Sequence, residues 1–198
     1  MAVKNIPYGI TDFERIRLNG YYYVDKSRFI PMIERAASFF FLIRPRRFGK
    51  SLFINMLSWY YDINRKDRFE ELFGDLYIGK QPTEEQGKYL ILSFNFSAVN
   101  PDPDKLMESF EWHCHLRFME FINEYATYFE PGFAEEVKNA PSATAKFSYV
   151  ISKAKELKLP IYLVIDEYDN FSNAILANAG TTHYKTCLLY TSPSPRDA

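Results

Sequence analysis

The sequence has few of the residues that form disulfides or metal sites. It contains two cysteines and three histidines. Cys187 lies in a C-terminal segment that we exclude from the fold below, so Cys114 is left alone and a disulfide framework is excluded. His113, Cys114 and His115 are adjacent, but side chains one and two residues apart on a helix do not converge on one ion. We therefore expect no metal site there.

Long apolar runs and a charge excess are also missing. No segment has the roughly 18 uninterrupted apolar residues of a membrane span, and residues 1–20 lack the apolar core of a signal peptide. The formal net charge of -1 gives no global field that would attract nucleic acid or a membrane. We expect a cytoplasmic protein with no membrane partner. At 47% hydrophobic and 18% aromatic residues, the chain can bury the core of one domain.

The stretch SFFFLIRPRRFGKSLF, Ser38 to Phe53, is typical of a phosphate-binding loop between a strand and a helix. The apolar residues 39–43 predict a strand buried on both faces. After Gly49, apolar residues recur at helical spacing, so a helix follows the loop. The start of a helix offers unpaired N–H groups and a positive dipole end to an anion. There Lys50 can reach the terminal phosphates of a nucleotide and the Ser51 hydroxyl can ligate Mg²⁺.

A glycine is missing where the usual pattern G-x-x-x-x-G-K-[ST] begins, because that position holds Arg44. Gly-Lys-Ser alone is weak evidence, since a Lys-Ser pair is also common in an ordinary solvated helix start. The arginines of the loop can contact nucleotide, pair with neighbouring acids or touch DNA phosphates, and we favour the first two. The candidate nucleotide-binding residues are Arg44, Pro45, Arg46, Arg47, Phe48, Gly49, Lys50, Ser51 and Leu52.

A second element strengthens this hypothesis. Residues 161–165, IYLVI, predict an apolar strand that ends in Asp166 and Glu167, as in a Walker B strand. Asp166 would hold Mg²⁺ beside Ser51, and Glu167 would orient or deprotonate the attacking water as the catalytic residue. Asp169 is the fallback for that role. The alternative is a buried strand with a solvated acidic end.

Three segments together resemble a known family. YYYVDKS at Tyr21 to Ser27, FFFLIRPRRFGKSLF around the loop and LVIDEYDNF at Leu163 to Phe171 are similar to the AAA-ATPase-like family of gut and anaerobic bacteria. The resemblance covers Ile6 to about Ala179. It implies that RPRRFGKS is the family's own form of the Walker A loop. It also implies that the intact protein continues into a sensor region and a nuclease-like domain of the PD-(D/E)XK type, through which DNA is a possible partner.

The C-terminal residues Cys187 to Asp197, CLLYTSPSPRD, resemble a translated sequencing-library adapter. We accordingly expect residues 1–180 to be the P-loop domain of a longer protein and 187–198 to be an artefactual disordered tail. A truncated chain lacks the strand that separates the two motif strands in related ATPases. We therefore expect an incomplete sheet and an inactive, insoluble or partly unfolded product.

The rest of the sequence predicts the other strands and helices. Residues 90–95 predict a second strand, a sheet neighbour of 161–165, and 75–78 a small strand or edge element. Helices are expected after Thr11 or Asp12, from Asp25 on, and over about 67–73, 104–125 and 142–157, with another between the last two. The YVDK segment is either a capping aspartate with a solvated Lys26 or a nucleotide contact, and we favour the former.

These features predict an α/β three-layer P-loop NTPase core with a parallel sheet, C-terminally truncated. The predicted function is Mg-ATP binding, with ATP hydrolysis in the intact protein. Two alternatives remain at this point. One is a nucleotide-sensing or DNA-associated module that does not hydrolyse ATP, and the other is a protein-interaction domain with a degenerate loop. Oligomeric state and the arginine finger are not specified by the sequence.

Overall fold

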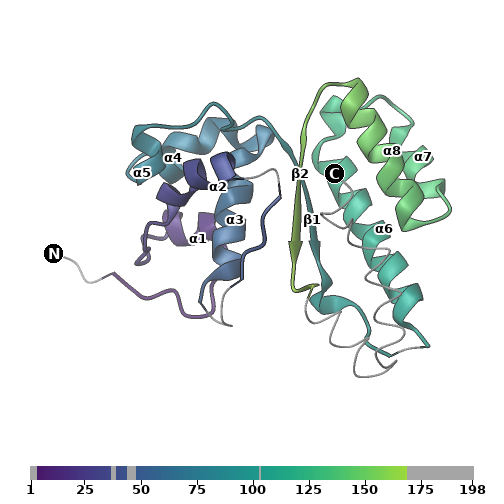
Figure 1. The fold of residues 1–198 in the computed structure, drawn as a ribbon, viewed down its shortest axis with the longest axis horizontal. Helices are drawn as coiled ribbons and strands as arrows, with labels where there is room; N and C mark the ends of the chain where they lie inside the picture. The colour runs from purple at the N-terminus through teal and green to yellow at the C-terminus, as the bar shows by residue number, and fades with distance from the viewer. Residues whose placement is uncertain (1–3, 37–38, 44–47, 103, 169–198) are drawn as a thin grey trace. The chain divides into compact units, whose positions relative to one another are not determined.

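The computed structural model describes residues 4–36, 39–43, 48–102 and 104–168 (Figure 1). Within these residues the chain divides into two compact units, one formed by residues up to 91 with 154–164 and the other by 92–153 with 165–168. The elements, with η for 3-10 helices, are α1 (Phe13–Leu18), η1 (Ser27–Phe29), α2 (Ile30–Ala36), α3 (Lys50–Tyr61), η2 (Ile63–Arg68), α4 (Phe69–Phe73), α5 (Tyr77–Lys80), β1 (Leu90–Asn95), η3 (Phe96–Ala98), α6 (Leu106–Glu124), η4 (Ala126–Tyr128), α7 (Phe133–Asn139), α8 (Ala143–Glu156) and β2 (Ile161–Asp166).

The sheet of the described residues consists of β1 and β2, which pair in parallel (Figure 1). Both strands and their adjacency agree with the sequence prediction, so the α/β class with a parallel sheet is confirmed. Each strand alternates between a buried and an exposed face. In β1 the buried side chains are Leu90, Leu92 and Phe94; in β2 they are Val164 and Asp166.

The strand predicted at residues 39–43 is absent, and that prediction is wrong. The segment has no strand conformation, and the described sheet contains only β1 and β2. Phe39, Phe41 and Ile43 are 88%, 78% and 85% exposed. A strand forms only where its N–H and C=O groups find a neighbouring strand, and β-forming side chains do not replace that partner. Leu42 alone packs against the core of the first unit.

The core of the first unit is built around α3. The helix begins where the sequence predicts, and its buried residues Phe53, Met56, Leu57, Tyr60 and Tyr61 share one face. Buried side chains of the other helices complete this core, including Phe13, Ile30, Leu72, Phe73 and Ile78. The α1 helix is capped by Asp12, one of the two caps that the sequence allows, and its carboxylate accepts the Arg15 N–H at 3.1 Å.

The edge element predicted at residues 75–78 is instead the short helix α5. Its start is capped from a distant part of the chain, because the Asp25 carboxylate accepts the Tyr77 N–H at 2.7 Å and the Ser27 hydroxyl accepts the Ile78 N–H at 3.1 Å. Gly79 allows the helix to lie directly against the carbonyl of Phe73, where a Cβ atom would clash. A four-residue helix has too few hydrogen bonds of its own to offset the cost of forming its first turn. It therefore depends on such tertiary contacts.

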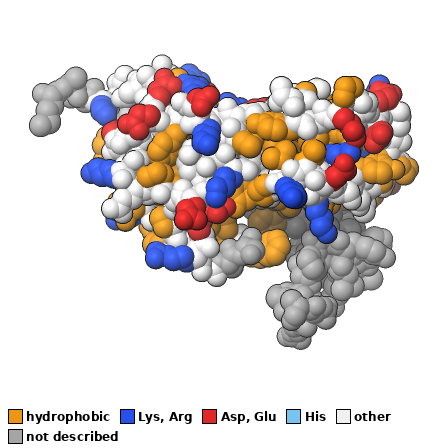
Figure 2. Space-filling view, turned by 90° about the horizontal axis from the view of Figure 1, so that it is seen from above, with side chains coloured by type: hydrophobic (Ala, Val, Ile, Leu, Met, Phe, Trp, Pro, Cys, Tyr) orange, Lys and Arg blue, Asp and Glu red, His pale blue; other side chains and the backbone are white. Residues whose placement is uncertain are grey.

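The second unit packs α6, α7 and α8 together (Figure 1). Aromatic contacts supply much of its core, such as the edge-on packing of Phe94 on Phe118 at 5.5 Å between ring centres. The start of α8 is tied to α6, because Glu111 accepts the Ala143 N–H at 2.6 Å. On the face shown in Figure 2, surface apolar side chains are interspersed with charged ones. None of the described helices is long and apolar enough to cross a membrane.

Candidate functional site

The first part of the candidate site is the start of α3. Gly49 precedes the helix with φ of 75° and ψ of 29°, a left-handed conformation that L side chains rarely adopt. Its carbonyl accepts the Phe53 N–H at 3.0 Å and so closes the first helical turn. A glycine at this position supplies no side-chain acceptor for the N–H groups of that turn. The backbone here therefore has the form that suits an anion at the positive end of a helix dipole.

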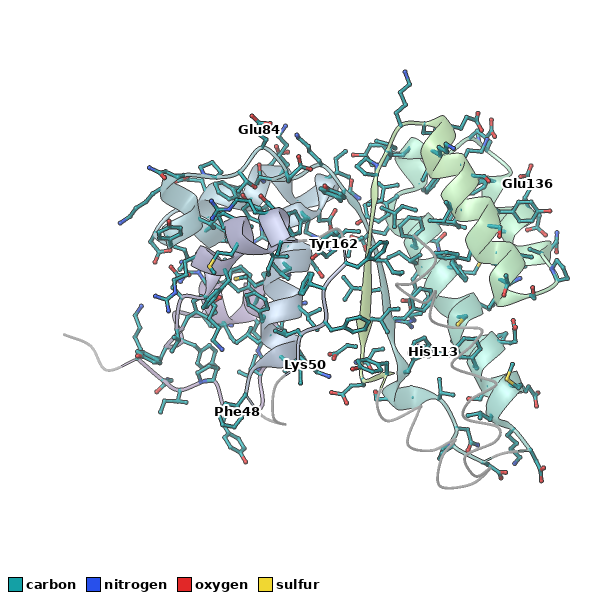
Figure 3. All side chains as sticks on the ribbon, in the orientation of Figure 1. Phe48, Lys50, Glu84, His113, Glu136 and Tyr162 are labelled. Atoms are coloured by element: carbon teal, nitrogen blue, oxygen red, sulfur yellow. The ribbon has the colours of Figure 1, made fainter. Side chains whose placement is uncertain are left out.

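Five of the predicted binding residues, 48–52, lie within the described part of the chain, at or next to the start of α3. Lys50 and Ser51 occupy the first turn, and Phe48, two residues before the helix, is 62% exposed (Figure 3). Leu52 is partly buried and packs against the core of the first unit. Arg44, Pro45, Arg46 and Arg47 lie outside the described residues.

One further cation belongs to the same helix start. The Nζ atom of Lys26 lies 3.4 Å from the position that a Cβ atom on Gly49 would occupy. Lys26 is not among the binding residues predicted from the sequence. The YVDK segment was the sequence feature that could have pointed to Lys26 as a nucleotide contact. A lysine in such a segment is more often solvated, which is the interpretation favoured above. The side chain is instead half-buried and directed at the glycine.

The second part of the candidate site is the acidic end of β2. Asp166 is the last residue of the strand and is 7% exposed, and Glu167 follows it with φ of 57°. The Glu167 N–H donates to the Asp166 carboxylate at 2.9 Å. The structure thus places Asp166 at the end of the strand and Glu167 directly after it, as the sequence predicts. They belong to the second unit and the α3 start to the first, and Asp169 lies outside the described residues.

His113, Cys114 and His115 face three different surroundings on α6. The His113 ring lies 5.8 Å from that of Phe96, whereas the His115 ring stacks on Trp112 at 5.4 Å. Cys114 is 4% exposed, and burial raises the pKa of its thiol to about 12. Burial also lowers the pKa of both histidines below the ordinary value. The three side chains thus pack against different neighbours.

Comparison with known proteins identifies a family that this chain matches. A family described as "Predicted AAA-ATPase" matches residues 7–190. An uncharacterised protein in the vnfD 5' region of Azotobacter chroococcum mcd 1 is 48% identical to this chain over 59 residues. That stretch is 29% of this chain and 11% of the relative, so the chain spans a small part of the relative's length. No solved structure matches the chain.

Proposed function

The chain belongs to the AAA-ATPase-like family, and on that premise we propose that it binds Mg-ATP at the start of α3. The observation that carries the proposal is the left-handed Gly49 followed by Lys50 and Ser51 in the first helical turn. The donor set suits the ligand, since backbone N–H groups, an ammonium and a hydroxyl are the groups that hold phosphates and Mg²⁺ in P-loop proteins. Residues 1–180 are proposed to form this domain.

Each residue has a distinct proposed role. Lys50 neutralises the terminal phosphates, and Ser51 and Asp166 are each proposed as magnesium ligands. The loop residues Arg44 to Leu52 surround the phosphate chain through their backbone and the arginine side chains. Glu167 is the catalytic base that orients or deprotonates the water in the intact protein. Phosphoryl transfer requires mainly positioning and charge neutralisation, which these groups supply.

Hydrolysis is proposed for the intact protein, where it would drive a conformational or DNA-associated process. The strained backbone at Glu167 supports a catalytic role, because residues in sparsely populated conformations concentrate at functional sites. A domain that holds nucleotide without turnover is the competing outcome. It would show Mg-ATP binding and no phosphate release.

The decisive experiment is calorimetric titration of the purified intact protein with Mg-ATP, compared with the Lys50→Ala variant. We expect Lys50→Ala to lose most of the affinity, because one cation on the phosphates is removed. The fold should remain intact by circular dichroism, since the buried residues of α3 begin at Phe53. Equal affinity in the two proteins would refute the proposed site.

A further inference from the structure

We propose that Lys26 is a second phosphate-binding cation, which reaches the start of α3 from the N-terminal segment. The inference rests on the proposed function and adds to the same site a residue from a separate part of the chain. Its direct support is the position of the Lys26 ammonium, 3.4 Å from where a Cβ atom on Gly49 would lie. Because Gly49 has no side chain, the ammonium comes against the backbone that immediately precedes the first helical turn.

The backbone on both sides of Lys26 is anchored. Asp25 uses one carboxylate oxygen for the Ser27 N–H at 2.8 Å and the other for the Tyr77 N–H at 2.7 Å. Ser27 is fully buried, and its hydroxyl accepts the Ile78 N–H at 3.1 Å. The two neighbours of Lys26 are therefore fastened to the start of α5. This anchoring fixes the backbone from which the Lys26 side chain extends toward Gly49.

The electrostatic setting also favours an anion. A lysine near the start of a helix is opposed by the positive end of the helix dipole. Lys26 makes no ion pair with any residue that the structure describes. Its acidic neighbour Asp25 has both oxygens engaged by backbone N–H groups. A phosphate held at this helix start would give the Lys26 ammonium an anionic partner.

The test compares the dissociation constants for Mg-ATP of the wild type, Lys26→Met and Lys26→Arg by calorimetry. Lys80→Met is the matched control, because Lys80 is an exposed lysine at the far end of α5 in the same unit. We expect Lys26→Met to weaken binding by about tenfold or more, as expected for a hydrogen bond to a charged group. Lys26→Arg should retain most of the affinity and Lys80→Met all of it.

A second measurement does not depend on the folding of a variant. In the wild type, acetylation of the Lys26 amine by an amine-reactive ester is followed by mass spectrometry with and without Mg-ATP. Nucleotide should slow acetylation of Lys26 and leave that of Lys80 unchanged. If Lys26→Met is unfolded by circular dichroism, this protection decides the question.

The outcomes separate the two proposals. Suppose that the wild type binds Mg-ATP and Lys50→Ala does not, while Lys26→Met binds normally and Lys26 is not protected. Lys26 is then a solvated lysine and only this inference fails. If the wild type binds no Mg-ATP, the proposed function fails and this inference fails with it. Equal weakening by Lys26→Met and Lys80→Met would show a general charge effect and would also overturn the inference.

Discussion

The backbone N–H of Glu167 donates a 2.9 Å hydrogen bond to the carboxylate of Asp166 at the point where β2 ends. Asp166 is almost fully buried, whereas the backbone of Glu167 turns into the left-handed region with φ of 57°. That conformation costs free energy in any residue other than glycine. The chain thus accepts strain at the residue that the sequence predicts to be catalytic, while the bond fixes its carboxylate neighbour.

The first prediction concerns Glu167→Gln in the intact protein. The variant should bind Mg-ATP within about twofold of the wild type, because glutamine preserves the size of the side chain. Phosphate release should fall about a hundredfold or more, since a general base contributes at least that factor. Phosphate release and calorimetric titration measure the two effects separately.

Asp166→Ala provides the contrast to Glu167→Gln. It should weaken the magnesium-dependent part of ATP binding, because a carboxylate ligand is lost. If Glu167→Gln hydrolyses ATP at the wild-type rate, Glu167 is not the base, and Asp169 becomes the candidate to test.

The sequence predicted best those elements whose signal is local. For α3, a glycine and an apolar face at helical spacing are enough to define the start and the buried side. For β1 and β2, compact apolar runs bounded by turns locate both strands, and the acidic end of β2 follows directly from Asp166 and Glu167. These features need no knowledge of distant residues.

The failures occur where distant residues decide the local structure. Residues 39–43 have the composition of a strand but lack a strand partner. The α5 helix exists because Asp25 and Ser27 cap it from far earlier in the chain. The same contacts direct Lys26 to Gly49, so the sequence could not distinguish that lysine from a solvated one. Tertiary contacts override local propensity in each case.

The second prediction concerns Lys146, whose side chain is buried in the second unit. It is 6% exposed, and its ammonium donates to the carbonyls of Val137, Lys138 and Ala140 at the end of α7. The lysine thereby satisfies carbonyls at the helix end, of which that of Val137 also accepts the Ala140 N–H at 3.3 Å. Lys146→Met should lower the free energy of unfolding by about 1 to 3 kcal/mol, because buried carbonyls lose their donor.

Urea denaturation of Lys146→Met and Lys155→Met measures this effect. Lys155 is exposed on the same helix, so its replacement removes the same charge without uncovering buried carbonyls. The Lys155 variant should remain within about 0.5 kcal/mol of the wild type. Equal stability of both variants would show that water satisfies the end of α7 as well as the lysine does.

The last prediction concerns Tyr162, a partly buried tyrosine that packs against the core of the first unit. Its ring stacks on Tyr61 at 4.7 Å and meets Tyr89 edge-on at 5.9 Å between ring centres. Its hydroxyl is buried and has no hydrogen-bond partner among the described residues. Burial, and then the charge of Glu34, raises the pKa of Tyr162 from 10.0 to about 12. The ring therefore stabilises the core, whereas the hydroxyl loses its hydration without compensation.

Tyr162→Phe keeps the ring contacts and removes the uncompensated hydroxyl. At neutral pH we expect the free energy of unfolding to rise by about 1 kcal/mol or to stay unchanged. Tyr61→Phe is the matched contrast, because the Tyr61 hydroxyl donates to the Glu34 carboxylate at 3.0 Å. Removal of that bonded hydroxyl should lower the stability by about 1 kcal/mol. A loss of stability in Tyr162→Phe as large as in Tyr61→Phe would contradict this account.

The advantage of Tyr162→Phe should grow in alkaline solution. In the unfolded chain the phenol loses its proton near pH 10, whereas in the folded protein it keeps the proton up to about pH 12. The folded state thus binds more protons in this interval, so wild-type stability falls as the pH rises from 10 to 12. One such phenol contributes up to about 1.4 kcal/mol per pH unit. Urea denaturation at several pH values should therefore give a shallower decline for Tyr162→Phe than for the wild type, and parallel declines would refute the raised pKa.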